Sequence, residues 1–323
     1  MEDGTNIINR RSNSGTNNCE EDGAHSVTLV SVTLENVTYL PVVKSLNGVK
    51  KRKFITCHDK PVRKKILDNV STNIEPYKLS AWMGPSGSGK TSLISVAGLR
   101  ISDIDGDLSP YTKIRVNGSV GRVPKRYVSV VWQEDLLLSN LTVQETILFA
   151  ARLKSPLIGA KVEEEVSRIT KDLGLDNVKH SLIGGLGSSA RGVSGGERKR
   201  VAVAVELVSR PSVLLLDEPT SGLDATTAMS LMHILKHLAI KGHSIAIAIH
   251  QPRTAIFEMF DSVLLLSRGK MVFDGLPSEV KTHLESHPKV SPLPAQTGVA
   301  DWIMVSLKTN TTINCLTNLF FLG

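Results

Sequence analysis

Alternating and continuous apolar runs mark out the strands of this chain. Apolar and polar residues alternate over Val32–Tyr39, which predicts a half-buried strand. The turn dipeptide Asn117-Gly118 lies between Ile114–Val116 and Val120 and predicts a hairpin. Further apolar runs predict strands near Val70–Ile74, over Lys78–Met83, over Tyr127–Trp132, over Val213–Leu216, over Ser244–Ile249 and over Val263–Leu266. Strands therefore recur along most of the chain.

Helical spacing appears between these runs. Thr91–Ala97 is expected to form a helix that Gly98 caps, and Leu141–Leu153 and Val162–Leu173 carry apolar residues at helical intervals. A Ser-x-x-Glu capping box from Ser194 to Glu197 predicts a helix start there, and Pro211 is expected to close that helix. One more apolar stripe on a helix is made by Leu231, Ile234, Leu235 and Leu238.

The order of these elements predicts the fold class. Strands that alternate with helices favour an α/β protein with a mainly parallel sheet wrapped by helices. Over residues 134–209 the predicted segments are helical and follow one another. We therefore expect a helical subdomain inserted into the α/β core. Residues 1–26 are rich in Asn, Gly, Ser and Glu and are expected to form a disordered tail.

Composition is ordinary for a globular domain, and charge is concentrated in one place. The 323 residues are 41% hydrophobic and 21% charged, with a net charge of +7. Aromatic residues make up 4%, too few for an extensive nucleic-acid stacking surface. A basic insertion at about residues 44–65 is either a solvated loop or a contact for anionic lipid head groups. Eight cations are crowded into it, namely Lys50, Lys51, Arg52, Lys53, Lys60, Arg63, Lys64 and Lys65, and Lys44 lies at its start.

The cysteines and the hydropathy of the chain indicate the cellular compartment in which it is expected. Cys19, Cys57 and Cys315 are far apart and lack metal-ligand spacing, which is typical of reduced thiols in the cytosol. No apolar run approaches the roughly 20 residues that cross a bilayer, and no secretory signal is visible. We therefore expect a cytoplasmic location, or the cytoplasmic face of a membrane if the chain assembles with a membrane domain.

The chain contains a complete phosphate-loop pattern. Its residues are Gly84, Pro85, Ser86, Gly87, Ser88, Gly89, Lys90 and Thr91. Glycines allow backbone N–H groups to approach phosphate oxygens, and the helix that follows adds its positive end. Lys90 is expected to neutralise the β- and γ-phosphates of a nucleotide, and Thr91 to offer its hydroxyl to Mg²⁺. A structural glycine turn is the alternative.

Polar groups follow three other predicted strands. Asp217 and Glu218 end an apolar strand; Asp217 is expected to bind Mg²⁺ through water, and Glu218 to polarise the attacking water. Gln133 can bridge metal and water, and His250 can contact the γ-phosphate. Read singly, each of these is as well explained by a plain loop or structural residue. Because the carboxyl ends of strands line the ligand crevice of α/β sheets, we expect one shared site.

A second anion-binding helix start lies at Ser194, Gly195, Gly196 and Glu197. A single bound triphosphate is not expected to contact both helix starts of one subunit. A head-to-tail dimer with two-fold symmetry is the economical solution. Asp224 in Ser-Gly-Leu-Asp would then lie at the seam between subunits, although it is also an ordinary N-cap for the next helix.

These motifs resemble the nucleotide-binding domain of ATP-binding cassette (ABC) transporters. The run Val193 to Arg200 and the run Ile249-His250-Gln251-Pro252 are similar to subfamily G, the White/pigment, sterol and multidrug half-transporter group. The resemblance covers Leu34 to Asp301. It implies that Lys90 and Thr91 belong to the Walker A loop, Gln133 to the Q-loop, Ser194–Glu197 to the signature, Asp217 and Glu218 to Walker B, Asp224 to the D-loop and His250 to the switch.

The resemblance also implies an architecture and an activity. We expect a P-loop NTPase core with an antiparallel β subdomain, an ATP-binding domain over residues 27–305 and a short tail over 306–323. The implied function is ATP hydrolysis with Mg²⁺, which powers export when two such domains close over ATP. The partner is a second nucleotide-binding domain, identical or different, whose signature loop acts in trans. No nucleic-acid partner is expected.

Two features depart from the family pattern. Tyr39 is a candidate for stacking on adenine, but the basic insertion interrupts the similarity there. Subfamily members continue after the region resembling Ala300-Asp301-Trp302 into membrane helices, whereas this chain stops at Gly323. We therefore expect a fragment, an alternative product or an incomplete gene model. The competing interpretations are a cassette ATPase without transport and a fragment that binds ATP without transporting.

Overall fold

The computed structural model describes residues 27–42, 63–101, 107–120, 124–184, 192–288 and 290–308. The predicted tail 1–26, residues 44–62 of the basic insertion, the three cysteines and residues 309–323 lie outside this part of the chain. Among the described residues, no helix combines the length and the apolar character that crossing a membrane requires.

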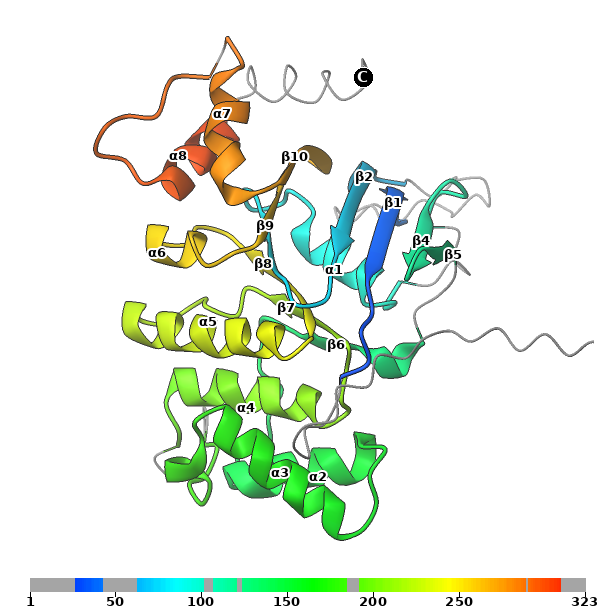
Figure 1. Ribbon diagram of the computed structural model, residues 1–323, viewed down its shortest axis with the longest axis vertical. Helices are drawn as coiled ribbons and strands as arrows, with labels where there is room; N and C mark the ends of the chain where they lie inside the picture. The colour runs from blue at the N-terminus through cyan, green and yellow to red at the C-terminus, as the bar shows by residue number, and fades with distance from the viewer. Residues whose placement is uncertain are drawn as a thin grey trace, which may run out of the picture.

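Two sheets form the frame of the structure (Figure 1). The larger has the strand order β10-β9-β3-β8-β7-β6, and β9, β3, β8, β7 and β6 run parallel. These strands are β3 (Leu79–Met83), β6 (Val128–Val131), β7 (Val213–Asp217), β8 (Ser244–Ile249), β9 (Ser262–Ser267) and the antiparallel edge β10 (Lys270–Gly275). The smaller, antiparallel sheet consists of β1 (Val32–Tyr39), β2 (Leu67–Ile74), β4 (Lys113–Val116) and β5 (Ser119–Val120).

Alternation along the central strands separates two cores. In β3, Leu79 and Met83 pack into one buried cluster, and Trp82 packs into the other, because successive side chains of a strand point to opposite faces. The cluster around Trp82 also holds the smaller sheet and α1 (Lys90–Ala97). The helix that follows the phosphate loop is therefore packed between the two sheets, which fixes the loop's position.

Helices cover the other face of the larger sheet in successive layers. Figure 1 shows α5 next to the sheet, then α4, and then α2 and α3 farthest from it. The bounds are α2 (Val143–Lys154), α3 (Ala160–Asp172), α4 (Gly195–Leu207), α5 (Ala225–Ile240), α6 (Thr254–Phe257), α7 (Val280–Glu285) and α8 (Val299–Ser306), with short 3₁₀ turns η2 (Lys125–Tyr127), η3 (Asp176–Val178) and η4 (Pro277–Glu279). The expected helical subdomain corresponds to α2, α3 and α4.

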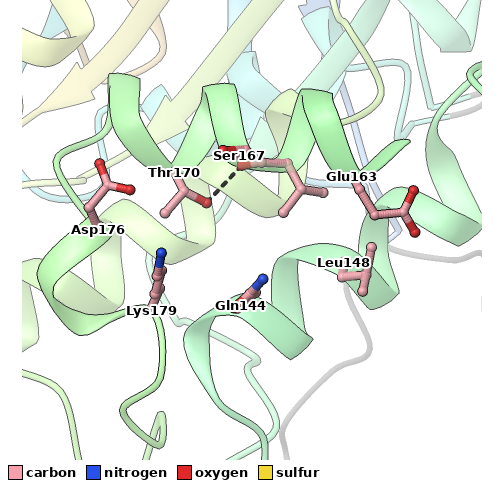
Figure 2. Close-up of a pocket in the computed structure, with 8 residues that line it drawn as sticks. Gln144, Leu148, Glu163, Ser167, Thr170, Asp176 and Lys179 are labelled. Atoms are coloured by element: carbon pink, nitrogen blue, oxygen red, sulfur yellow. Dashed lines mark hydrogen bonds between the residues drawn. The ribbon is translucent and has the colours of Figure 1, made fainter. Parts of the chain in front are cut away.

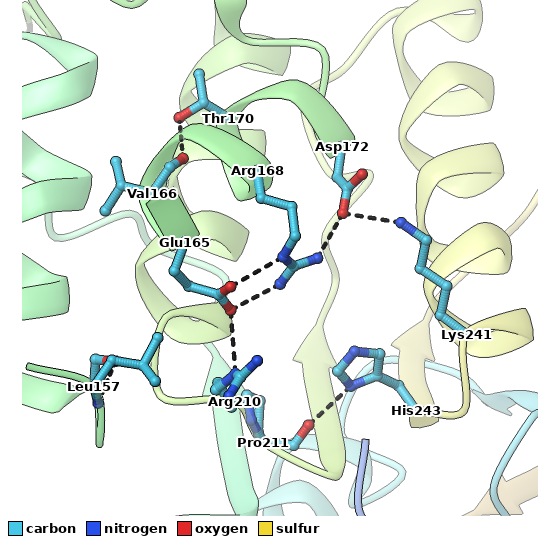
Figure 3. Close-up of polar contacts among 11 residues, drawn as sticks. Leu157, Glu165, Val166, Arg168, Thr170, Asp172, Arg210, Pro211, Lys241 and His243 are labelled. Carbon is cyan, nitrogen blue, oxygen red and sulfur yellow. Dashed lines mark hydrogen bonds and ion pairs between the residues drawn. The ribbon is translucent and has the colours of Figure 1, made fainter. Parts of the chain in front are cut away.

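A polar network attaches α3 to the rest of the fold (Figure 3). Glu165, which is 1% exposed, accepts two hydrogen bonds from the Arg168 guanidinium at 2.8 and 3.0 Å. It also pairs with Arg210, just beyond α4, at 3.3 Å. Asp172 joins Arg168 at 2.8 Å and Lys241, at the end of α5, at 2.9 Å. The outer helix is thus tied to two inner ones by charge as well as by apolar packing.

The fold class expected from the sequence is confirmed: the chain is α/β, with a parallel-rich sheet, an antiparallel sheet and helices. The strand Val32–Tyr39 has the predicted bounds, and Gly98 caps α1. The expectation that Pro211 closes the signature helix is wrong. That helix ends at Leu207, and Arg210 follows in a left-handed conformation with φ 54°.

Candidate functional site

The sheet order brings four predicted strand ends together. β3, β8, β7 and β6 are consecutive neighbours and run parallel, so their carboxyl ends meet at one edge. Gly84 follows β3, His250 follows β8, Asp217 ends β7, and Gln133 lies two residues beyond β6. The convergence expected from the strand pattern is therefore present in the structure.

The phosphate loop turns sharply between β3 and α1. A Cβ on Gly84 would lie 2.1 Å from the carbonyl oxygen of Leu266, so only glycine fits that close approach to β9. Gly89 has φ 105° and its carbonyl accepts the Leu93 N–H at 2.9 Å, which starts α1. Between them, Ser86 and Gly87 form an exposed tip. Small residues thus leave the backbone of the tip open to a ligand.

Lys90 is folded back over this loop. Its residue is 5% exposed, and Nζ donates hydrogen bonds to the carbonyls of Gly84 at 2.8 Å and Pro85 at 3.3 Å. Burial lowers the pKa of the Lys90 ammonium, and the negative charges of Glu218 and Asp217 oppose that shift. The amine therefore lies within electrostatic reach of both acids, as a single phosphate site requires.

Asp217 is a buried carboxylate, and one of its two oxygens has no hydrogen-bond partner among the described residues. Burial raises the pKa of its carboxyl, and the Thr91 hydroxyl and the charges of Lys90 and Lys199 oppose that rise. Within the described residues, Oδ1 of Asp217 and Oγ of Ser88 are buried and have no hydrogen-bond partner. Buried polar atoms without a partner often indicate an ion or water that completes the site.

This corner of the site fits Mg²⁺ by its donor chemistry. Thr91, Asp217 and Gln133 offer hydroxyl, carboxylate and amide oxygens, the hard ligands that Mg²⁺ prefers. The described residues hold no cluster of three or more His, Cys, Asp or Glu side chains suited to a metal. A small protein donor set still suits an ion that keeps several waters and binds substrate phosphate.

Glu218 adopts a strained backbone conformation beside Asp217. Its φ is 46°, which a residue with a Cβ seldom adopts, and its N–H donates to the Ala248 carbonyl at 2.9 Å. The Gln133 amide Nε2 donates to Glu218 Oε2 at 3.3 Å. Strained backbone conformations of this kind are concentrated at functional sites. The sequence pattern gave no indication of the strain at Glu218.

His250 completes the same edge. Burial and the charge of Lys90 lower the pKa of its imidazole, Glu218 opposes them, and the charge of Lys308 adds to the lowering. A lowered pKa favours the neutral ring, which can donate one hydrogen bond. Lys308, just beyond α8, is a neighbour that sequence reasoning missed, because nothing in the local pattern brings residue 308 to residue 250.

The Ser194–Glu197 turn forms a separate group. Ser194 caps α4 in a reciprocal capping box: Oγ accepts the Glu197 N–H at 3.3 Å, and Glu197 Oε2 accepts the Ser194 N–H at 2.8 Å. A Cβ on Gly196 would lie 1.9 Å from Thr227 Cγ2, so this turn rests on the start of α5. Gly195 lies in the same turn, at the exposed first position of α4.

Asp224 is the N-cap of α5. Its carboxylate accepts the Thr226 and Thr227 N–H groups at 3.0 and 3.1 Å, and hydrogen bonds from Thr227 hold its pKa below the ordinary value. Among the described residues, no hydrogen bond or ion pair joins the Ser194–Glu197 turn to the Gly84–Thr91 loop. Within one chain the predicted residues therefore fall into two groups.

Comparison with known proteins agrees with this geometry. Residues 67–221 match the ABC transporter family. The chain is 41% identical to ABC transporter G family member 26 of Arabidopsis thaliana over 239 residues, which are 72% of this chain and 34% of that protein. It is 42% identical to G family member 12 of Dictyostelium discoideum over 249 residues, 75% of this chain and 37% of that protein.

The chain carries an ABC transporter domain. Its similarity also extends to G family member 4 of Dictyostelium discoideum, at 36% identity over 300 residues, 85% of this chain and 37% of that protein. The chain thus spans about a third of the length of these relatives. The recognition of an ABC domain similar to subfamily G is confirmed, and ABC transporter ATP-binding domains form an ATPase family.

A hollow of about 190 Å³ borders the phosphate loop of the ABC domain. Its lining residues are Pro85, Ser86, Gly87, Ser88, Ser267, Arg268, Leu307 and Lys308. Small-molecule sites usually enclose about 300–1,000 Å³, so this hollow alone does not surround a nucleotide. Arg268 and Lys308 add two cations beside the loop that the sequence pattern did not single out.

A second hollow lies within the helical subdomain (Figure 2). It measures about 70 Å³ and is bordered by α2, α3 and the η3 turn, with Gln144, Thr170 and Lys179 among its lining residues. The Thr170 hydroxyl donates to the Val166 carbonyl at 2.7 Å rather than remaining available. Its small volume and its place among the outer helices leave the strand-end edge as the candidate site.

Proposed function

We propose that this ABC domain binds ATP with Mg²⁺ and hydrolyses it to ADP and phosphate, and that dimer closure over ATP powers export by a subfamily G transporter. The single observation that carries the proposal is the position of Lys90. Its buried amine lies on the phosphate loop and within electrostatic reach of Asp217 and Glu218. A cation placed between a glycine loop and two acids is suited to a metal-bound triphosphate.

In this proposal the loop holds the phosphates. The backbone N–H groups of Ser86, Gly87, Gly89 and Lys90, together with the start of α1, donate to phosphate oxygens, and Lys90 exchanges its carbonyl contacts for the β- and γ-phosphates. Thr91, Asp217 and Gln133 would hold Mg²⁺, which when bound supplies charge neutralisation at the β- and γ-oxygens. The influence of the Thr91 hydroxyl on the pKa of the Asp217 carboxyl supports this assignment, because it indicates that two of the three donors lie close together.

The hydrolytic step is assigned to Glu218 and His250. Glu218 accepts a proton from water as the water oxygen bonds to the γ-phosphorus and the bond from that phosphorus to ADP breaks. General-base help of this kind contributes about 10²–10⁴-fold. Gln133, hydrogen-bonded to Glu218, helps to orient the water. His250, whose lowered pKa favours the neutral imidazole, donates a hydrogen bond to the γ-phosphate.

The signature turn is assigned to the other subunit of a dimer. Ser194, Gly195, Gly196 and Glu197 would close over the ATP of the partner, with Asp224 at the seam. One observation supports this arrangement: among the described residues, the turn makes no hydrogen bond to the phosphate loop of its own chain. Two-fold symmetry would complete both sites with the same contacts.

The cellular setting follows from the same proposal. The domain would work at the cytoplasmic face of a membrane and pass its closing motion to a membrane domain. The relatives are named ABC transporters, which does not favour the alternative of a cassette ATPase without transport. The experiment below measures how activity depends on self-association of the chain, and it therefore tests whether the dimer partner is an identical chain.

Phosphate release at increasing chain concentration tests the proposal. We expect the rate per chain to rise with concentration, since in this proposal the dimer is the active species and separate chains in solution must meet to form it. Glu218→Gln should retain ATP binding and lose activity by about 10²-fold or more. Glu258→Gln, an exposed glutamate beyond α6, is the matched control and should behave as wild type. A fully active Glu218→Gln variant would contradict the assignment.

A further inference from the structure

Three consecutive cations follow the capping box of α4, and each binds a different segment. Arg198 Nη2 donates to the carbonyls of Ile183 at 3.1 Å and Gly184 at 2.7 Å. Arg200 Nη1 donates to the carbonyls of Leu173 and Gly174, both at 3.4 Å. Consecutive helical residues point about 100° apart, which is why neighbours in the sequence reach separate partners.

Lys199, between them, reaches the loop that carries Gln133. Its residue is 4% exposed. Nζ donates to the Gln133 carbonyl at 2.9 Å, to Asp135 Oδ1 at 2.7 Å and, more weakly, to the Trp132 carbonyl at 3.5 Å. An ammonium has three N–H donors, and these three acceptors account for all of them. The side chain is therefore committed to the backbone and one carboxylate of a single loop.

This contact continues directly into the site. The Gln133 carbonyl binds Lys199, and the Gln133 side-chain amide donates to Glu218 at 3.3 Å. Lys199 also acts on Asp217, because its charge opposes the rise in the pKa of that carboxyl. A short polar path thus joins the helix that Ser194 begins to both strand-end acids. Burial strengthens each of these electrostatic contacts relative to the same contacts in water.

We propose that Lys199 is a positioning residue for ATP hydrolysis: it holds the Gln133 loop in register with the Ser194 helix, so that Gln133 meets Glu218. The inference rests on the proposed function, because it assumes that Glu218 activates water. It assigns the middle cation of the Arg198-Lys199-Arg200 run a task inside the domain rather than a contact with nucleotide or lipid. A misplacement of about 1 Å in such a group can lower the rate by about 10²-fold.

The first test needs no nucleotide. Amide hydrogen exchange of the whole chain is measured for Lys199→Met, which has similar length without the ammonium, and for Arg200→Met as the matched control. We expect Lys199→Met to raise exchange over residues 132–137 and Arg200→Met to raise it near residues 173–175 instead. Asp135→Asn, which keeps an oxygen acceptor for Lys199, is a milder variant with the same expected site of change and guards against loss of folding in Lys199→Met.

The second test measures coupling in the steady state. Lys199→Met is expected to lower kcat for ATP by about 10–100-fold while the KM changes less than about 3-fold. In a Gln133→Ala background the same substitution should change kcat by less than about 2-fold, because residues that act through one another are not additive. Lys199→Arg, which keeps a cation and donors, should recover part of the rate, and Arg200→Met should keep most of it.

The outcomes separate the two proposals. Unchanged exchange over residues 132–137 in both Lys199→Met and Asp135→Asn overturns the role of Lys199, even if the wild-type chain hydrolyses ATP. Equal losses of kcat for Lys199→Met with and without Gln133 overturn it as well. If the wild-type chain does not hydrolyse ATP at any concentration, the proposed function fails, whatever the exchange measurement shows.

Discussion

The side-chain amide of Gln133 donates a hydrogen bond to the carboxylate of Glu218 at 3.3 Å, across the ends of β6 and β7. These residues are 85 positions apart in the sequence and follow the ends of neighbouring strands. The Gln133 loop is also bonded to α4 through Lys199. Any movement of the helical subdomain that shifts this loop therefore changes the surroundings of the proposed general base.

Lys90→Ala should weaken ATP binding. A hydrogen bond to a charged group contributes about 1.5–3 kcal/mol, which corresponds to a loss of roughly 10–150-fold in affinity. The substitution also removes a positive charge that interacts with Asp217 and Glu218. Equilibrium binding of a fluorescent ATP analogue measures the effect. Lys113→Ala, an exposed lysine on β4, is the control and should bind as wild type does; wild-type affinity in Lys90→Ala would remove the phosphate loop from the proposal.

Ser194→Arg should block dimers that depend on nucleotide. The added side chain would occupy the turn that is assigned to the ATP of the partner. Light scattering with Mg²⁺-ATP, in the Glu218→Gln background that preserves bound ATP, reports the dimer. Ser194→Ala is the matched control, because it loses the helix cap, at a cost of about 1 kcal/mol, without adding bulk. Normal dimers of Ser194→Arg would count against the arrangement in trans.

His243 should make the fold less stable in mild acid. The ring is buried and its Nδ1 lies 2.8 Å from the Pro211 carbonyl oxygen. Burial lowers its pKa in the folded state, so its contribution is complete above the unfolded pKa of about 6.5 and is lost as pH falls toward the lower folded value. His243→Asn cannot titrate. We expect the free energy of unfolding to fall less between about pH 7.5 and 5.5 in this variant; equal pH dependence would exclude His243 as a cause.

Glu165→Gln should destabilise the attachment of α3. The carboxylate is buried and pairs with Arg168 and Arg210, so the loss of its charge should lower the free energy of unfolding by about 1–3 kcal/mol. Glu163→Gln, on the same helix, breaks the exposed pair with Arg152 and should cost under about 1 kcal/mol. Urea unfolding of the two variants compares them directly. A larger loss for Glu163→Gln would reverse the proposed importance of the network.

Much of the fold could be predicted from local patterns. The strand Val32–Tyr39, the hairpin at Asn117-Gly118 and the capping box at Ser194 depend on residues close in sequence, so the chain itself displays them. Tyr127 was expected to begin a strand, and it lies instead in the short η2 turn before β6. Element ends depend on neighbours in space, which a local pattern does not contain.

The parts of the site that escaped prediction depend on contacts between distant segments. Lys308 reaches the surroundings of His250 because α8 ends beside the phosphate loop. Lys199 lies in the Val193–Arg200 run that resembles subfamily G, but no role was predicted for it, and its partners lie 64 to 67 positions away. The steric fit of Gly196 against Thr227 likewise requires two helices to be placed first. The residue types in the sequence indicated the kind of chemistry. The packing of distant segments determines which of these side chains lie in the same site.

The left-handed backbone at Glu218 has a consequence for the energetics of the whole domain. A residue with a Cβ held at φ 46° is less favourable than glycine there by about 1–2 kcal/mol. Glu218→Gly would therefore remove the proposed base and yet relax this local tension, so an inactive chain would resist denaturation better than the active one. At Glu218, the backbone conformation that accompanies the proposed catalytic role therefore lowers the stability of the fold.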